Sequence, residues 1–197
     1  MKYIESLDGL RAIAVILVLL VHAHLAEVGW VGVQLFFVLS GYLITSILLN
    51  EKGENAVFYF TRFYWRRSLR IFPLYFFYLF ACMALYALRR EPAGLLENLP
   101  YLLTYTSNVS HSFLKVPDSR FFSHFWSLAV EEQFYIFWPF IVYFLSEKTL
   151  KKITFDLLLF VPLFRYFFAI WMSHKGMAPR ETAFAIYYLT PFQIDAF

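Results

Sequence analysis

The apolar stretch from Ser6 to His24 most constrains this chain, because it carries two ionisable residues, Arg11 and His22. An ionisable side chain inside a membrane-spanning segment is unfavourable, and by default it marks a functional site. On a helix the eleven-residue spacing places both side chains on one face, about 16 Å apart along the axis. His24 points to nearly the opposite side. The spacing predicts a fixed cation near one membrane surface and a titratable base, His22, deeper in the bilayer.

Composition indicates that the whole chain is a membrane protein. Of its 197 residues, 60% are hydrophobic and 16% are charged, whereas soluble domains are roughly half apolar and about a quarter charged. We therefore expect an all-α polytopic membrane protein. The single Cys82 excludes an intramolecular disulfide and a thiolate metal cluster. The few basic residues flank apolar runs, so nothing indicates nucleic-acid binding.

A cleavable signal peptide is the alternative interpretation of the first run. Glu5 and Asp8 lie beside Lys2 in what would be its basic region, and no small-residue cleavage site follows. We therefore expect a retained first span.

The apolar runs predict about six transmembrane helices. Their expected ranges are 10–26, 31–49, 71–88, 125–145 and 153–172, with a last one beginning at residue 182. The run at 99–109 is too short to span and predicts an interfacial or re-entrant segment. The last run has no closing loop, which indicates a truncated sequence.

Basic residues predict the orientation of the chain. Lys and Arg concentrate at 50–70 and at 147–152, and the positive-inside rule places such segments in the cytoplasm. The N-terminus is then cytoplasmic as well, and the 91–124 segment is extracytoplasmic.

Several single residues in the first two runs carry local predictions. Asp8 is placed to cap a helix starting at Gly9 and to pair with Arg11. Gly32 and Gly41 are small enough to let neighbouring helices approach closely. The polar Gln34 lies inside an apolar run and needs a hydrogen-bond partner.

Four arginines form a cationic stripe on the predicted helix that follows the second run. Arg62, Arg66 and Arg70 are four residues apart, and Arg67 is three from Arg70. One interpretation is an anchor to anionic lipid headgroups. The other is a site for the phosphates of a soluble cytoplasmic ligand, because the arginine fork matches phosphate geometry.

Adjacent carboxylates, Glu131 and Glu132, lie near the start of the 125–145 run. One interpretation is a helix cap and a salt bridge to a neighbouring helix. The alternative is a polar pocket for a hydroxylated acceptor, or a group that orients a base. His111 and His124 are expected to be loop or interface residues, and no metal site is expected, because no partner lies at ligand spacing.

The motifs resemble the acyltransferase-3 family of membrane-bound O-acyltransferases, which includes bacterial O-antigen acetyltransferases. The pair Arg11 and His22 matches the family's Arg-x10-His motif, and Arg67 with Arg70 matches its Arg-x-x-Arg motif. The matching segments are Ser6–His24, Gly32–Thr45, Phe63–Phe76, Trp126–Pro139 and Thr190–Asp195. In the last one, members often have Arg at the position of Gln193.

The resemblance implies a bundle of about ten helices, of which residues 1–197 are a single, incomplete, membrane-embedded acyltransferase domain. It implies transfer of an acyl group, such as acetyl, from cytoplasmic acyl-CoA to a hydroxyl of an extracytoplasmic carbohydrate or glycolipid. The expected location is the bacterial plasma membrane. Acyl-CoA is a substrate in this reading, and no permanently bound cofactor is expected.

Under this resemblance the stripe residues Arg66, Arg67 and Arg70 hold the phosphates of the donor. The pantetheine arm then extends inward along the face that carries Arg11 and His22. His22 has an unperturbed pKa of ~6.5, which suits a general base near neutral pH.

The expected catalytic residues are His22, Arg11, Glu131 and Glu132. His22 deprotonates the acceptor hydroxyl, or alternatively carries the acyl group covalently, and either glutamate orients His22 or binds sugar hydroxyls. Two other classes of function remain open on the sequence: a transporter or flippase of lipid-linked sugars, and a non-catalytic membrane sensor.

Overall fold

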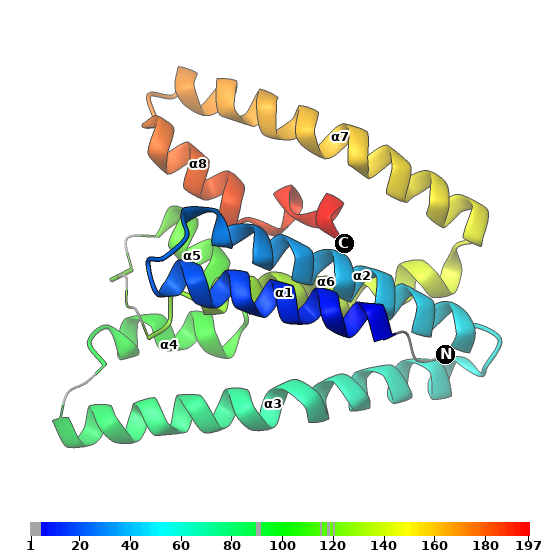
Figure 1. Cartoon of the computed structure of the whole chain (residues 1–197), viewed down its shortest axis with the longest axis horizontal. Coiled ribbons are helices and arrows are strands. Elements are labelled where there is room, and N and C mark those ends of the chain that lie inside the picture. The colour runs from blue at the N-terminus through cyan, green and yellow to red at the C-terminus, as the bar shows by residue number, and fades with distance from the viewer. Residues whose placement is uncertain (1–4, 90–91, 115, 118, 120) are drawn as a thin grey trace.

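The computed structural model describes residues 5–89, 92–114, 116–117, 119 and 121–197, and all regular structure among them is helical (Figure 1). The helices are α1 (Glu5–His22), α2 (Val31–Glu51), α3 (Ala56–Arg89), α4 (Leu95–Leu103), α5 (Ser107–Phe113), α6 (Phe125–Phe144), α7 (Glu147–His174) and α8 (Pro179–Tyr188). Short 3-10 turns are η1 (Glu27–Trp30), η2 (Thr190–Phe192) and η3 (Ile194–Ala196).

Three helical segments in the described part of the chain are long and apolar enough to cross a membrane. They are Val28–Glu51, which includes α2, and the helices α3 and α7. Few of their residues are buried within the protein, so their apolar side chains face outward, as expected for helices in contact with lipid. The all-helical architecture and the membrane location are thereby supported.

The ends of the long helices gather at two opposite ends of the molecule (Figure 1). One end, here called the basic end, holds the α2–α3 and α6–α7 turns with Lys52, Arg62, Lys148 and Lys151. The opposite end, here called the loop end, holds His22 and the described parts of the 92–124 segment. Helices α1 and α3 both run from the basic end to the loop end, and α6 runs back (Figure 1).

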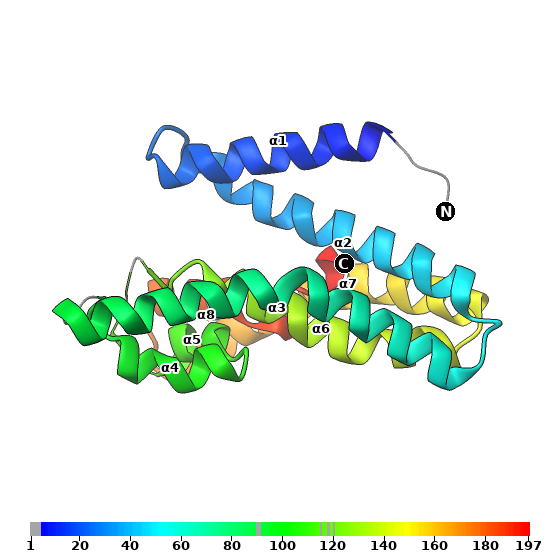
Figure 2. The same cartoon turned by 90° about the horizontal axis from the view of Figure 1, so that it is seen from below.

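Helices α1 and α2 form an antiparallel hairpin, as the short turn between them predicts. Gly32 lies against α1 so closely that a Cβ atom there would be 2.6 Å from the carbonyl oxygen of Ala14. The prediction that Gly32 permits a close helix approach is confirmed. Viewed from below, α1 stands apart from α3, with α2 at its side (Figure 2).

The span expected at 71–88 lies within a longer helix. This helix, α3, has 34 residues. Asn55 starts it, because its side-chain oxygen accepts a hydrogen bond of 2.8 Å from the N–H of Val57. Pro73 lies inside this helix. The arginine stripe and the apolar run belong to one uninterrupted helix.

The sixth span expected from Thr182 onward is wrong. Helix α8 ends at Tyr188, and the residues after it form η2 and η3. These turns fold back into the bundle, where the ring of Phe197 stacks on Phe134 at 4.1 Å and on Phe37 at 4.8 Å. Pro191 contributes to the end of the helix because it lacks the N–H that a further turn requires.

Candidate active site: an arginine cavity and a histidine end

A polar cavity of about 330 Å³ lies between α1, α2, α3 and α6. Its polar lining consists of Arg11, Ser40, Arg67, Arg70, Glu131 and Tyr135. Four residues expected at the site are thus brought together from three separate helices. We call this space the arginine cavity.

Glu131 is held in the cavity wall by a neutral partner. The Ser40 hydroxyl of α2 donates a hydrogen bond of 2.9 Å to Oε1 of Glu131 on α6. Arg67 and Arg70 lie close enough to act on this carboxylate electrostatically. No ion pair within 4.0 Å joins Glu131 to any described basic side chain. The salt-bridge interpretation of Glu131 therefore has no support in the described residues.

Arg67 is supported by aromatic faces. Its guanidinium lies 4.9 Å from the ring centre of Tyr135 and 5.9 Å from that of Phe63. Such cation–π contacts hold the charge without using the N–H donors. Among the described residues neither Arg67 nor Arg70 forms an ion pair, so their forks are free to bind an anion in the cavity.

Arg11 pairs with Asp8 at 2.7 Å, as the sequence predicts. The expected capping role of Asp8 is wrong, because α1 begins at Glu5 and Asp8 lies within it. Both side chains of the pair are partly exposed, so the contact leaves Arg11 accessible from the cavity.

The arginine stripe divides between two environments. Arg62 and Arg66 face Glu51 at the end of α2, at 3.3 Å and 3.5 Å. Arg67 and Arg70 line the cavity instead. Arg66, expected to bind the donor with them, is therefore not in the cavity.

The glutamate pair is divided as well. Neighbouring residues on a helix point about 100° apart, so Glu132 faces away from the cavity, toward Tyr75 and Tyr105, on which its charge acts. Its Oε1 atom is buried and has no hydrogen-bond partner among the described residues. The structure thus brings Glu131, and not Glu132, together with the arginines.

His22 lies at the loop end, exposed and outside the arginine cavity. Its Nδ1 atom is 2.7 Å from the carbonyl oxygen of Val18. A carbonyl oxygen only accepts hydrogen bonds, so Nδ1 carries the proton and Nε2 presents a lone pair. The backbone of α1, rather than a glutamate, thus gives His22 the tautomer that a general base needs.

A second pocket, of about 390 Å³, lies along α3 next to the arginine cavity. It shares Arg70 and Ile71 with the arginine cavity and reaches His124. The remaining lining is Leu74, Tyr75, Tyr78, Phe125 and Leu128. We call this mostly apolar space the α3 pocket.

Helices α1 and α3 run in the same direction, so equal residue spacings along them cover equal distances. Arg11 and His22 are eleven residues apart on α1, and Arg67 and Tyr78 are eleven apart on α3. At ~1.5 Å per residue, both distances along the axis are about 16 Å. Arg11 and Arg67 therefore lie toward the basic end, and His22 and Tyr78 lie toward the loop end.

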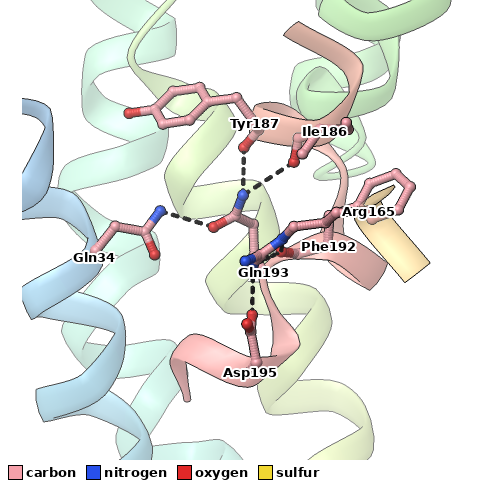
Figure 3. Close-up of polar contacts among 7 residues, drawn as sticks. All are labelled: Gln34, Arg165, Ile186, Tyr187, Phe192, Gln193 and Asp195. Atoms are coloured by element: carbon pink, nitrogen blue, oxygen red, sulfur yellow. Dashed lines mark hydrogen bonds and ion pairs between the residues drawn. The ribbon is translucent and has the colours of Figure 1, made fainter. Parts of the chain in front are cut away.

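The segment matching the family's last motif holds the C-terminal turns in place (Figure 3). Gln34 donates a hydrogen bond of 2.8 Å to Oε1 of Gln193, which confirms that Gln34 needs a partner. Nε2 of Gln193 donates to the carbonyls of Ile186 and Tyr187 at 3.2 Å and 2.8 Å. The buried Gln193 therefore ties the end of α8 to α2.

Arg165 of α7 holds the same segment from the other side, through an ion pair of 2.6 Å with Asp195 and contacts to the carbonyl of Phe192 (Figure 3). The motif around Gln193 and Asp195 thus has structural partners on two helices, α2 and α7.

The sequence analysis missed a second polar network, which joins Gln133, Asn108 and Thr190. Gln133 donates hydrogen bonds to the carbonyl of Tyr105 at 2.7 Å and to Oδ1 of Asn108 at 3.0 Å. Asn108 donates to Thr190 at 3.0 Å, and the Thr190 hydroxyl bonds Gln133 in turn. The signal was present, because Asn108 and Gln133 are amides beside or inside apolar runs.

Ser40, Tyr135 and His124 were not expected at the site. His124 was expected only as a loop or interface residue. The four-residue spacing of Glu131 and Tyr135 was an available signal, since it places both on one helix face. No group of three or more His, Cys, Asp or Glu in the described residues is placed to hold a metal ion.

A family model described as an acyltransferase domain matches residues 4–192, which is nearly the whole chain. The chain belongs to the acyltransferase-3 family. No solved structure gives a significant match.

Two curated relatives carry the similarity further. The peptidoglycan O-acetyltransferase OatA of Listeria monocytogenes is 36% identical over 185 residues, which cover 87% of this chain and 29% of the relative. A Bacillus subtilis protein named "Putative peptidoglycan O-acetyltransferase YrhL" is 40% identical over 148 residues, covering 70% and 23%. This acyltransferase-3 chain thus spans less than a third of the length of these relatives.

Proposed function

We propose that this chain forms the donor-binding and transfer site of a membrane O-acetyltransferase. The donor is acetyl-CoA, and the acceptor is a hydroxyl of a cell-envelope carbohydrate, with peptidoglycan favoured by the names of the relatives. The observation that carries the proposal is that the α3 pocket leads from the arginine cavity to His124. His22, whose Nε2 presents a lone pair, lies within electrostatic range of His124.

The arginine cavity is suited to the charged end of the donor. Coenzyme A carries several phosphate groups. Arg67 and Arg70 present to one space guanidinium forks that form no ion pair with any described side chain. Arg11 adds a third cation from α1. The pantetheine arm, thin and largely apolar, then follows the α3 pocket, which brings the thioester toward the histidine end.

His22 acts as the general base in this mechanism. Its Nε2 atom takes the proton from the acceptor hydroxyl as the oxygen attacks the thioester carbonyl. The new C–O bond forms, the C–S bond breaks, and the leaving thiolate takes the proton from His22. The products are an ester of the carbohydrate and free coenzyme A.

The orientation follows from the basic end. Lys52, Arg62, Lys148 and Lys151 gather there, so the positive-inside rule places this end and the start of α1 in the cytoplasm. The donor then enters from the cytoplasm, and the loop end faces the extracytoplasmic acceptor. We further propose that α1 and α6 cross the membrane with α2, α3 and α7, their ionisable residues facing the protein interior.

The test is transfer of label from [14C]acetyl-CoA to a peptidoglycan disaccharide by the protein reconstituted in liposomes. We expect labelled saccharide from the wild type and a loss of at least a hundredfold in His22→Ala, with the variant still folded by size-exclusion chromatography. Full activity in His22→Ala would remove this residue from the mechanism. Movement of the saccharide across the bilayer without label transfer would instead indicate a transporter.

A further inference from the structure

His124 is a second histidine at the loop end, and the mechanism above does not use it. It directly precedes α6 and lines the α3 pocket. Its ring lies 4.2 Å from the ring centre of Phe125 and 6.0 Å from that of Tyr78. Aromatic side chains from α6 and α3 therefore fix the plane of this imidazole.

The ring nitrogens of His124 are available to a ligand. In the part of the chain that the structure describes, no hydrogen bond joins either nitrogen to another protein group. The side chain is partly covered by Phe125 and Tyr78 but remains accessible, so a ligand can reach the ring. A neutral imidazole offers one donor and one acceptor, which is the pair of functions that recognises hydroxyl groups.

His124, which precedes α6, and His22, which ends α1, lie near each other at the loop end. The His22 charge acts on the His124 ring, so the two imidazoles lie within electrostatic range. Equal eleven-residue offsets along α1 and α3 place His22 at the depth of Tyr78, whose ring contacts His124. The loop end therefore combines two imidazoles with the partly exposed ring of Tyr78.

We propose that His124 is an acceptor-binding residue, which holds a sugar ring of the carbohydrate acceptor against the ring of Tyr78 by a hydrogen bond to a ring substituent. The C–H face of the sugar packs on the aromatic surface, and the hydroxyl to be acetylated then faces Nε2 of His22. This inference rests on the proposed function, since it assigns the acceptor's position in the same site.

The role of His124 is tested with His124→Phe, which keeps a flat ring among the aromatic neighbours and removes both nitrogens. We expect the KM for the peptidoglycan disaccharide to rise about tenfold, which corresponds to one lost hydrogen bond of roughly 1.4 kcal/mol. The KM for acetyl-CoA and the kcat at saturating disaccharide should stay within about twofold of the wild type. His124→Asn, which retains an N–H donor, should recover part of the affinity.

A matched control is His174→Phe, because His174 is an exposed histidine at the end of α7. It should leave both KM values unchanged. Direct binding of the disaccharide, measured by thermophoresis without donor, should weaken about tenfold in His124→Phe and stay unchanged in His174→Phe.

The two proposals fail in different ways. Equal disaccharide binding by the wild type and His124→Phe overturns the acceptor role of His124, whether or not label is transferred. Absence of transfer by a wild-type protein that binds the disaccharide through His124 overturns the transferase function and supports His124 as a saccharide-binding residue.

Discussion

The Ser40 hydroxyl donates a hydrogen bond of 2.9 Å to Oε1 of Glu131, which joins α2 to α6 at the wall of the arginine cavity. This hydrogen bond fixes the carboxyl group of Glu131 in the cavity that Arg67 and Arg70 also line. Arg67 and Arg70 interact electrostatically with Glu131, but among the described residues they form no ion pair with it. The arrangement therefore orients the cations while leaving their donors open to an anionic substrate.

The charge of Glu131 is tested by Glu131→Gln, which retains an oxygen for the Ser40 hydroxyl. If the negative charge positions Arg67 and Arg70, acetyl transfer from labelled acetyl-CoA should fall at least tenfold. Transfer in Ser40→Ala should fall less, because this substitution removes one hydrogen bond to Glu131 and leaves the carboxyl group in the cavity. Glu54→Gln, on an exposed turn, serves as the control. Wild-type rates in Glu131→Gln would show that this carboxylate has no part in transfer.

The division of the arginine stripe predicts a difference between neighbouring residues. Arg70→Ala and Arg67→Ala should raise the KM for acetyl-CoA by about tenfold to a hundredfold, because each removes a charge-assisted contact to phosphate of roughly 1.5–3 kcal/mol. Arg66→Ala should change it by less than threefold, since Arg66 faces Glu51 outside the cavity. Equal effects of the three substitutions would contradict a donor site in the cavity and favour a general attraction to anionic headgroups.

The network at Gln193 predicts a loss of stability. Gln193→Ala leaves Gln34 and the carbonyls of Ile186 and Tyr187 without their partner. Unsatisfied buried groups destabilise by about 1–3 kcal/mol each when no water reaches them, so thermal unfolding in detergent should shift down by several degrees. Asn50→Ala, at an exposed position, should leave the midpoint unchanged. An unchanged midpoint in Gln193→Ala would show that the stacked ring of Phe197 suffices to hold the segment.

Local pattern was sufficient for the features that depend on one helix or one tight turn. The hairpin of α1 and α2, the pair Arg11–Asp8 and the close approach at Gly32 all follow from short-range spacing. The need of Gln34 for a partner was predictable from its apolar surroundings, but its partner was not, because Gln193 lies 159 residues away in the chain.

Residue spacing did not predict the surroundings of adjacent residues that face different neighbouring helices. A stripe defined by steps of three and four residues is broad, so it groups Arg66 with Arg67 although Glu51 attracts only the first. The same limit applies to Glu131 and Glu132, whose surroundings depend on which neighbouring helix each faces. The end of α8 was missed because the aromatic residues after it satisfy an apolar pattern while their side chains stack inside the bundle.

The surroundings of His124 predict a pH-dependent stability. Desolvation by neighbouring groups, and secondarily the His22 charge, lower the pKa of His124 below its usual value. The groups that face it are His22 from α1 and, across the α3 pocket, Tyr78 and Arg70 from α3. The folded protein therefore binds a proton at His124 less readily than the unfolded chain does.

Stability from this residue is present above the unfolded pKa of ~6.5 and is lost as the pH falls through that value toward the lower folded pKa. The unfolding midpoint of the wild type in detergent should thus drop between pH 7.5 and pH 5, and His124→Phe should show a smaller drop. His174→Phe should retain the full wild-type drop, because that side chain is exposed and does not line the α3 pocket. A drop in His124→Phe as large as in the wild type would mean that other groups carry the pH dependence and that His124 is not desolvated in solution.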